Sequence, residues 1–573
     1  ELRHKYTIYP VFRRVDTCAG EFEAYTPYLY STYERGAVET KAIKPFGNKG
    51  DRGNVIILGS GPNRIGQGLE FDYCCVQAAL TLREEGYRVI MVNCNPETVS
   101  TDYDISDCLY FEPLTLEDVL NICREEEPDG LILQFGGQTP LKLALPLLEE
   151  GIVIWGTSPR DIDRAENRRE FDVVVDKLDL WEPAYGIATR PQEAWKIAEK
   201  LGFPILVRPS YVLGGLAMRL VYTVEELDIY LQSGPPVSSA NPLLIDRYLE
   251  GAVELDVDAL SDGEKVVIGG VMEHVEQAGV HSGDSCCVLP PYSIGTQQLK
   301  EIHRQTELLA GELNIRGLLN IQFAVRGREV YILEANPRAS RTVPFTGKAT
   351  GVPLAGLAAR VIAGASLSNL GFTSEVIPDY YSVKEAVFSF SRFDNADIVL
   401  GPEMRSTGEV MGIDANLGLA MAKALLAAGT PLPVKGAIFI TVADRDKPQA
   451  VEMARSLWRL GYNLLATRGT ATALRDAGVT VEEVKRIGEG SPHMLDYINE
   501  GQVDLIINTP AGSGAFSDGK CMRQQAVHRG VSLITTMQGA MAALDGMRAL
   551  QQSGMDVQCL QEYYSCGESS PLS

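Results

Sequence analysis

The chain lacks the long apolar segments that mark membrane proteins and secreted precursors. No stretch of its 573 residues approaches the roughly 20 consecutive apolar residues that a membrane-spanning helix needs. The first residues, Glu1 to Lys5, are mostly charged and are not followed by the apolar core of a signal peptide. We therefore expect a cytoplasmic protein with no membrane partner. Because the chain starts without methionine, we also expect it to be the later part of something longer.

Zinc motifs, redox motifs and an excess of basic residues are missing as well. The eleven cysteines include the adjacent pairs Cys74-Cys75 and Cys286-Cys287 but show no C-x-x-C spacing. Most lie in apolar segments, which favours buried, reduced thiols. Lys and Arg number 52 against 75 Asp and Glu, so the net charge is −23. This charge argues against a general nucleic-acid binder, although it leaves room for a local basic pocket.

What is present indicates several packed α/β units. With 45% hydrophobic and 22% charged residues, a globular chain of this length has room for about three or four domains. Residues 1–50 are aromatic and irregular and end in a linker rich in Gly and Lys. Apolar strands then alternate with amphipathic helices, which indicates a parallel sheet. The strands are predicted at residues 55–58, 89–92 and 130–133, and the helices at residues 71–85 and 116–125.

Two further units follow in the sequence. One begins near Asp161 with a charged helix predicted over residues 163–177. Another begins near Lys435, with strands predicted at residues 436–442, 463–467 and 503–509. We therefore predict a multidomain protein of the α/β and α+β classes.

The glycine-bearing loop at residues 59–68 does not match the familiar nucleotide-binding motifs. Arg64 stands where G-x-G-x-x-G needs its third glycine, and Gln67-Gly68 replaces the Lys and Ser/Thr of the phosphate loop. The loop lines a pocket or interface, or it is a simple turn, and both interpretations stay open. Later strands of this unit end in Asn95 to Thr98 and in Gly136 to Pro140, so we expect a cleft at the carboxyl ends of the strands.

The strongest functional pattern is a strand pair near residues 320–341. Two short apolar segments flank a turn at Arg326 to Arg328, which predicts a hairpin with Gln322 opposite Glu334. Residues two apart share a strand face, so Asn336 points the same way as Glu334. These side chains offer three hard oxygen ligands of the kind that hold Mg²⁺. Arg338 and Arg341 follow at once and are suited to a transferred phosphoryl group, although a hairpin with a solvated polar face is the alternative.

Three nearby segments suggest a nucleotide site around this hairpin. A strand ending at Ser210 delivers Arg208, and the turn at residues 211–218 either folds over phosphates or is an ordinary hairpin turn. Strict alternation over residues 254–258 places three carboxylates on one strand face. A solvated edge explains Asp258, whereas Glu254 or Asp256 could meet ribose hydroxyls. His281 sits in a tight polar loop, where a structural and a functional role are equally favoured.

The last unit shows a pattern typical of an anion pocket. Its strands lead into residues 467–470 and 508–514, which are rich in small hydrogen-bond donors. Lys447, Lys485 and Arg486 are possible phosphate contacts, and plain strand-to-helix turns are the alternative interpretation.

Together with these features, residues 207–215, 272–285 and 334–344 resemble the large-subunit family of carbamoyl-phosphate synthetases. The resemblance covers essentially the whole chain and corresponds to the second synthetase half with its allosteric domain. It implies a pre-ATP-grasp α/β domain, an ATP-grasp domain and a C-terminal methylglyoxal-synthase-like α/β domain. The implied boundaries are 1–50 for the end of the oligomerisation region and a linker, 51–160 for the pre-ATP-grasp domain, 161–432 for the ATP-grasp carbamoyl phosphate synthetic domain with a C-terminal extension, and 433–573 for the allosteric domain.

Carried over residue by residue, the resemblance implies a role for each matching position. Mg²⁺ or Mn²⁺ would be held by Gln322, Glu334 and Asn336, while Arg338 and Arg341, with Asn336, would act on the transferred phosphate. ATP would be surrounded by Arg168, Arg208, Arg247, Leu249, Glu254, Gly279, Val280, His281, Ser282, Gln322 and Glu334. A nucleotide monophosphate or ornithine would be the effector, and the matching positions are Lys447, Thr467, Thr470, Arg486 and Asn508. Arg486 stands where the family often has lysine, and Pro510 where it often has a second threonine, which leaves the effector open.

In this family the corresponding half phosphorylates carbamate with ATP and serves arginine and pyrimidine biosynthesis. The first synthetase half and the glutaminase small subunit are absent from this chain and would be its partners. Two alternatives are another ATP-grasp ligase and a regulatory subunit that is inactive without the missing half.

Overall fold

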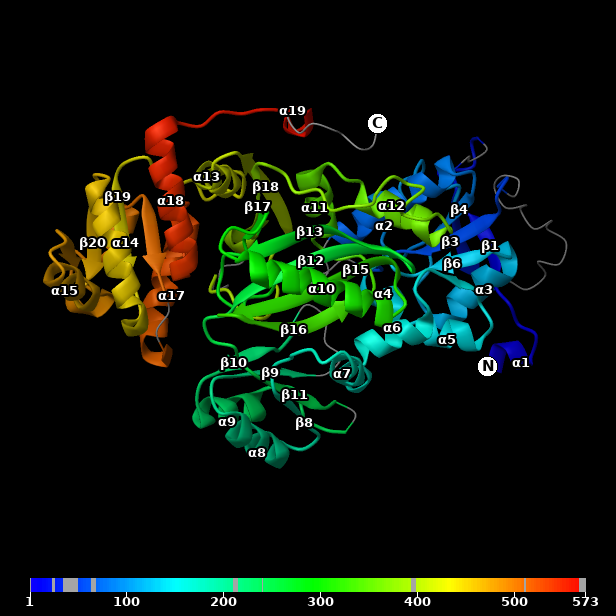
Figure 1. Cartoon of the computed structure of the whole chain (residues 1–573), viewed down its shortest axis with the longest axis horizontal. Coiled ribbons are helices and arrows are strands. Elements are labelled where there is room, and N and C mark those ends of the chain that lie inside the picture. The colour runs from blue at the N-terminus through cyan, green and yellow to red at the C-terminus, as the bar shows by residue number, and fades with distance from the viewer. Residues whose placement is uncertain are drawn as a thin grey trace.

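The computed structural model describes residues 2–22, 26–33, 50–62, 69–209, 215–239, 241–392, 398–509 and 512–565. Figure 1 shows three sheet-based regions along the long axis and a smaller lobe that carries α8 and α9. The predicted fold class is confirmed, because parallel α/β sheets and antiparallel sheets with flanking helices are both present. Among the described residues, no helix has the length and apolar character needed to cross a membrane.

The first sheet has seven strands in the order β1-β2-β5-β4-β3-β6-β7. All its neighbouring strands are parallel except the pair β1 and β2. The strands are β1 (Val11–Arg14), β2 (Tyr28–Thr32), β3 (Asn54–Leu58), β4 (Arg88–Val92), β5 (Cys108–Tyr110), β6 (Gly130–Ile132) and β7 (Ile154–Trp155). The helices are α1 (Leu2–Lys5), α2 (Glu70–Glu84), α3 (Leu116–Glu126), α4 (Gln138–Leu141) and α5 (Ala144–Glu149). The three strands and two helices predicted for this unit are confirmed.

The expectation that residues 1–50 are irregular is wrong for β1 and β2. These strands extend the first sheet, and Phe12 packs edge-on against Tyr110 at 4.9 Å between ring centroids. Burial of Leu29 and this aromatic contact hold the segment to the domain that follows it. Most of the predicted linker lies outside the described residues.

The helix predicted over residues 163–177 is also wrong as a single element. The structure has α6 (Pro159–Glu166) and α7 (Arg168–Lys177), which meet at Asn167. Asn167 is extended, with φ −83° and ψ 112°, and its side chain accepts a hydrogen bond from the backbone N–H of Arg169. An asparagine in this role caps a new helix instead of continuing the old one.

The middle of the chain forms two antiparallel sheets. The smaller has the order β10-β9-β11-β8, with β8 (Tyr185–Ala188), β9 (Ile205–Pro209), β10 (Arg219–Val221) and β11 (Leu243–Arg247). Its helices are α8 (Pro191–Leu201) and α9 (Val224–Ser233). The turn predicted over residues 211–218 lies partly outside the described residues.

The larger antiparallel sheet has seven strands in the order β16-β15-β12-β13-β14-β17-β18. They are β12 (Val253–Asp262), β13 (Val266–His274), β14 (Cys287–Leu289), β15 (Arg316–Arg326), β16 (Glu329–Asn336), β17 (Tyr381–Val387) and β18 (Gly408–Asp414). Its helices are α10 (Thr296–Glu312), α11 (Val343–Thr350), α12 (Leu354–Ile362) and α13 (Leu417–Ala427). Helix α12 contacts both α2 and β15, so it joins the first sheet to this one.

The C-terminal sheet is parallel throughout, with the order β21-β20-β19-β22-β23. Its strands are β19 (Ala437–Thr441), β20 (Asn463–Thr467), β21 (Glu482–Val484), β22 (Leu505–Asn508) and β23 (Ser532–Ile534). The helices are α14 (Lys447–Arg459), α15 (Arg468–Asp476), α16 (Met494–Asn499), α17 (Gly512–Arg529), α18 (Met537–Ser553) and α19 (Leu560–Ser565). Helix α19 leaves this domain and lies over the middle region, where Tyr563 packs against Tyr380 at 5.2 Å (Figure 1).

The thiol prediction is confirmed for the cysteines in apolar segments. All ten cysteines that the structure describes are free, and those buried are Cys74, Cys75, Cys108, Cys123, Cys286 and Cys287. Cys521 and Cys559 are exposed.

Candidate functional site

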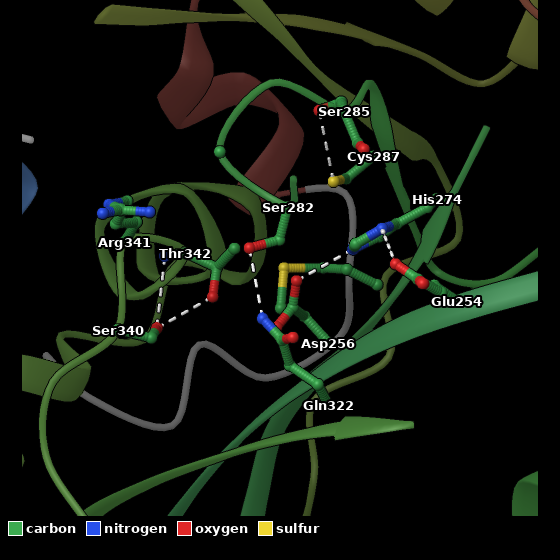
Figure 2. A network of polar contacts seen from close by, with 12 residues as sticks. Glu254, Asp256, His274, Ser282, Ser285, Cys287, Gln322, Ser340, Arg341 and Thr342 are labelled. Carbon is green, nitrogen blue, oxygen red and sulfur yellow. Dashed lines mark hydrogen bonds and ion pairs between the residues drawn. The ribbon is translucent and has the colours of Figure 1, made fainter. Parts of the chain in front are cut away.

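The predicted hairpin forms with the predicted register. Strands β15 and β16 are antiparallel, with Gln322 opposite Glu334 and Asn320 opposite Asn336. Asn336 Nδ2 donates to Glu334 Oε1 at 2.9 Å, so these side chains lie on one face. Gln322 Nε2 donates to Ser282 Oγ at 3.1 Å, as Figure 2 shows. The structure therefore brings the oxygen-bearing side chains of the hairpin together beside the loop that carries Ser282.

Two arginines lie directly after this hairpin. Arg338 donates to Asn336 Oδ1 at 2.8 Å and, through Nε, to Gln138 Oε1 at 3.1 Å. Both guanidinium groups also lie over the ring of Phe71, at 5.6 Å for Arg338 and 5.9 Å for Arg341. The two positive charges are therefore held on one side of the hairpin end.

His281 is the neighbour of Arg341. Arg341 Nη1 lies 3.4 Å from His281 Nε2. Burial and the adjacent charge of Arg341 hold the pKa of His281 well below its usual range. The imidazole is therefore neutral at neutral pH. Its Nδ1 accepts a hydrogen bond from the backbone N–H of Gly283 at 3.0 Å, so its single proton lies on Nε2, the nitrogen beside Arg341.

Glu254 and Asp256 lie on strand β12, on the other side of the loop that carries Ser282. Glu254 Oε1 accepts a hydrogen bond from the backbone N–H of Gly279 at 3.0 Å, and burial raises its pKa. His274 lies between two carboxylates, with Nε2 2.8 Å from Asp256 Oδ2 and Nδ1 3.7 Å from Glu254 Oε2 (Figure 2). Burial opposes ionisation of Asp256, but the hydrogen bond and charge of His274, the hydrogen bond from Asn320 and the charge of Lys384 together outweigh it and lower the pKa of Asp256.

The idea that Asp258 lies at a solvated edge is wrong. Strand β12 is paired on both sides, with β13 and β15, and Asp258 is only 1% exposed. Alternation along a strand identifies a face but not whether that face is covered, and here the segment after β16 covers it.

The remaining predicted ATP residues are spread over the smaller sheet and its surroundings. Arg168 pairs with Glu182 at 2.6 Å and lies 4.3 Å from the ring centre of Tyr185. Arg208 pairs with Asp246 at 3.1 Å, and Arg247 ends β11 with an exposed side chain.

Leu249 connects this region with the hairpin. It belongs to a small apolar cluster with Ala252, Ala278 and Ala324, against which Leu333 packs. Val280 lines a small cavity of about 70 Å³ that Thr509 and Thr536 of the last domain also line.

Several residues of this region escaped the sequence analysis. Gln138 and Glu166 both lie beside Arg338. Gln138 donates a hydrogen bond to Glu166, and the Glu166 carboxylate lies 4.0 Å from Arg338 Nε. The buried Lys384 donates to the backbone oxygen of Ser282 at 3.2 Å. The sequence pointed to a functional position for Gln138 only through its place after a strand, in the segment from Gly136 to Pro140. No sequence pattern pointed to a functional role for Glu166 or Lys384.

The residues predicted to form an anion pocket lie at the carboxyl ends of β19, β20 and β22. Thr467 Oγ1 is 3.1 Å from Thr441 Oγ1, and Thr470 Oγ1 accepts from the backbone N–H of Val442 at 3.4 Å. Asn508 Nδ2 donates to the Thr441 oxygen at 3.1 Å. Thr467 at the end of β20, Thr470 in the first turn of α15 and Asn508 at the end of β22 thus lie around Thr441 and Val442.

The charged residues of this pocket come from the flanking helices and loops. Lys447 Nζ pairs with Asp444 at 2.7 Å and approaches Gly469, so it lies next to the first turn of α15, which carries Thr470. Arg486 follows β21, the neighbour of β20, at the same edge of the sheet. Arg523, which is buried and was not predicted, donates to Asn508 Oδ1 at 2.8 Å. Pro510 lies outside the described residues.

Comparison with known families assigns three segments of the chain. Residues 51–164 match the carbamoyl phosphate synthase preATP-grasp domain, and residues 167–370 match the carbamoyl-phosphate synthase L chain, ATP binding domain. Residues 449–535 match the MGS-like domain.

Relatives match along nearly the whole chain. The carbamoyl phosphate synthase large chain of Ralstonia nicotianae is 54% identical over 557 residues, covering 96% of this chain and 51% of that protein. The large chain of Archaeoglobus fulgidus is 54% identical over 555 residues, covering 97% and 51% respectively. The chain therefore spans about half the length of these relatives.

A solved structure shares the fold of about two thirds of the chain. N5-carboxyaminoimidazole ribonucleotide synthetase in its ADP complex aligns with a TM-score of 0.50 at 16% identity, covering 65% of this chain and 95% of that one.

Proposed function

The chain belongs to the family of carbamoyl phosphate synthase large chains, and from this premise we propose that it transfers the γ-phosphoryl group of ATP to carbamate. The products are carbamoyl phosphate and ADP. The observation that carries this proposal is the end of the β15–β16 hairpin, where three oxygen-bearing side chains lie beside two arginines.

The donor set of the hairpin fits a hard divalent cation. Gln322 and Asn336 offer neutral amide oxygens and Glu334 offers a carboxylate, which is a set that suits Mg²⁺ while leaving positions for phosphate oxygens. The same oxygen ligands accept Mn²⁺. When bound, the cation supplies charge neutralisation on the phosphates of ATP.

The protein's own side chains account for the rest of the chemistry. A carbamate oxygen forms a bond to the γ-phosphorus, the bond from that phosphorus to the bridging oxygen breaks, and ADP leaves with the electron pair. Arg338 and Arg341 place positive charge where negative charge is spread over the transferred group. Neutral His281 packs beside Arg341, 3.4 Å from its guanidinium, and adds no positive charge of its own there.

The nucleotide is proposed to lie between the smaller sheet and the hairpin. Arg168 and Arg208 supply charge for its phosphates, and Leu249 supplies an apolar surface for its base. Glu254 accepts from ribose hydroxyls, because its carboxylate is partly buried and already oriented by Gly279.

Supply of carbamate and control of the reaction involve further partners. The first synthetase half and a glutaminase small subunit are proposed to provide carbamate in the cytoplasm for arginine and pyrimidine synthesis. A nucleotide monophosphate or ornithine is proposed as the effector of the C-terminal domain, where Lys447, Thr467, Thr470 and Asn508 gather with Arg486 at the same sheet edge.

The reverse partial reaction tests the proposal. The purified chain is given ADP, carbamoyl phosphate and Mg²⁺, and ATP is measured. Glu334→Gln removes the one carboxylate of the donor set, so ATP formation is expected to fall by at least about 100-fold. Glu329→Gln is the matched control, because Glu329 lies on the same strand with its side chain 41% exposed.

Three results would contradict the proposal. ATP formation that persists in Glu334→Gln would remove the hairpin from the reaction. Equal ATP formation from acetyl phosphate would favour another ATP-grasp ligase. No ATP from the parent chain would show that the site is inactive without the missing half.

A further inference from the structure

Asp258 is a buried carboxylate at the centre of the larger antiparallel sheet. Its oxygens accept four hydrogen bonds, from Ser340 Oγ at 2.6 Å, Thr342 Oγ1 at 2.7 Å, Thr346 Oγ1 at 3.0 Å and Asn320 Nδ2 at 3.0 Å. Burial raises the pKa of Asp258, while the hydrogen bonds from these donors lower it. A carboxylate with this many donors orients them all at once.

Three of the four donors belong to the segment that carries Arg341. Arg341 lies between Ser340 and Thr342, and Figure 2 shows the three residues together. Ser340 Oγ also accepts from the backbone N–H groups of Thr342 and Val343, each at 3.2 Å. The Ser340 hydroxyl therefore accepts two backbone hydrogen bonds that shape the turn into α11, and it donates its own proton to Asp258.

The fourth donor links the same carboxylate to the metal-ligand strands. Asn320 lies opposite Asn336 and two residues before Gln322 on β15. Its Nδ2 also lies 3.3 Å from Asp256 Oδ1. Asp258 thus fixes both the strand that carries Gln322 and the turn that carries Arg341.

We propose that Asp258 is a positioning residue for phosphoryl transfer, which holds Arg341 in register with the hairpin through Ser340 and Thr342. This inference rests on the proposed function, because it assigns Arg341 to the transferred phosphoryl group. Asp258 itself faces the hydroxyl groups of the turn. Its effect is therefore expected on turnover, since displacing a catalytic group by about 1 Å can cost roughly 100-fold in rate.

Substitutions at Thr342 test the proposal with little change in volume. Thr342→Val removes the donor to Asp258 but keeps the branched shape, and Thr342→Ser keeps the hydroxyl. The control is Thr306→Val, because Thr306 is also fully buried in this domain but donates only to Ile302 of its own helix, at 2.8 Å. Asp258→Asn is the stronger variant of the same test.

Kinetics of ATP formation from ADP and carbamoyl phosphate provide the first readout. We expect Thr342→Val to lower kcat about tenfold and Asp258→Asn about 10- to 100-fold, with the KM for ADP within about twofold of the parent. Thr342→Ser and Thr306→Val are expected to match the parent. Thr342→Val added to Arg341→Ala should cost little beyond Arg341→Ala alone, because both act through one guanidinium. Full additivity, or a loss in Thr342→Ser equal to that in Thr342→Val, overturns the proposal.

Crystal structures of the parent and of Thr342→Val provide a readout that needs no turnover. The guanidinium of Arg341 is expected to leave its 3.4 Å contact with His281 in the variant. If the parent chain makes no ATP, the proposed function fails for the isolated chain, and this comparison alone decides the role of Asp258. An Arg341 that keeps its place in the variant shows that Asp258 does not position it.

Discussion

Arg338 donates a 2.8 Å hydrogen bond to Oδ1 of Asn336, the oxygen through which Asn336 would bind a divalent cation. The guanidinium and the cation therefore compete for one atom. Binding of the cation requires Arg338 to break or share this hydrogen bond. Arg338 Nε also donates to Gln138 Oε1 at 3.1 Å, and this second hydrogen bond keeps the side chain in place. The arrangement would link cation binding to the position of Arg338, the arginine proposed to act on the transferred phosphate.

Arg338→Met should therefore raise the affinity for the divalent cation while it strongly lowers turnover. Removing the positive charge of Arg338 favours binding of the divalent cation nearby. Loss of one group that stabilises charge in the transition state typically costs about 100- to 1,000-fold in rate. Affinity is measured by titrating Mn²⁺ with detection by electron paramagnetic resonance. Arg326→Met, on the exposed turn of the same hairpin, is the control with the same charge change. Weaker Mn²⁺ binding in Arg338→Met would contradict the competition.

Nucleotide affinity should depend on pH through Glu182. Burial raises the pKa of Glu182 to about 7, against the opposing charge of Arg168, and Asp172, Asp176 and Asp246 raise it further. A nucleotide phosphate that draws Arg168 away removes the stabilising charge, so the carboxyl takes up a proton on binding. By linkage, affinity falls as pH rises through 7.

Binding of MgADP at pH 6 and pH 8 checks this direction. We expect a weakening of about three- to tenfold in the parent chain and none in Glu182→Gln. Glu375→Gln is the control, because burial also raises the pKa of Glu375 to about 7 but its neighbour is His303, 3.4 Å away, and not an arginine. If the MgADP affinity of Glu182→Gln still weakened from pH 6 to pH 8, the pH dependence would belong to another group.

The hairpin could be predicted from the sequence because its determinants are local. Two apolar runs and a short turn with Gly327, whose φ is 64°, specify the pairing of Gln322 with Glu334. The positions of Asn336 and Arg338 follow from strand geometry and chain order. The same local reasoning placed Thr467 and Asn508 at one edge of the C-terminal sheet.

The surroundings of the hairpin could not be predicted, because they depend on contacts between distant segments. Asp258 is buried only because β13 and β15 flank its strand and the turn at Ser340 covers its face. Strands β1 and β2 carry no strong apolar alternation and are held because β2 pairs with β5 and β1 pairs with β2. Arg523 approaches Asn508 from a helix whose sequence gave no reason to expect it.

Lys447→Gln should weaken binding of the effector's phosphate. Lys447 Nζ lies beside the first turn of α15, which carries Thr470, and pairs with the exposed Asp444. Losing one charged phosphate contact is expected to cost about tenfold in affinity, since hydrogen bonds to charged groups are worth roughly 1.5–3 kcal/mol. Calorimetry with a purine and a pyrimidine nucleoside monophosphate measures this. Arg475→Gln, in the last turn of α15, is the control, and an equal loss there would point to general charge attraction.

The buried pair of Arg88 and Glu126 should dominate the stability of the first domain. Arg88 Nη1 lies 2.6 Å from Glu126 Oε2, their side chains are 4% and 1% exposed, and Tyr110 also donates to Glu126 at 2.6 Å. Arg88→Met leaves a buried carboxylate without its main counter-charge, which typically costs about 3–5 kcal/mol. Hydrogen exchange of the amides in β3 to β6 reports this loss directly.

The double variant Arg88→Met with Glu126→Leu separates the charge from the packing. It should recover much of the loss, because replacing a whole buried ion pair with apolar residues is often neutral, although Tyr110 then loses its acceptor at a cost of about 1–3 kcal/mol. Arg52→Met, which breaks the exposed pair with Glu85, is expected to change stability by less than about 1 kcal/mol. A double variant as unstable as Arg88→Met alone would show that Arg88 stabilises the sheet through its packing and not through its charge.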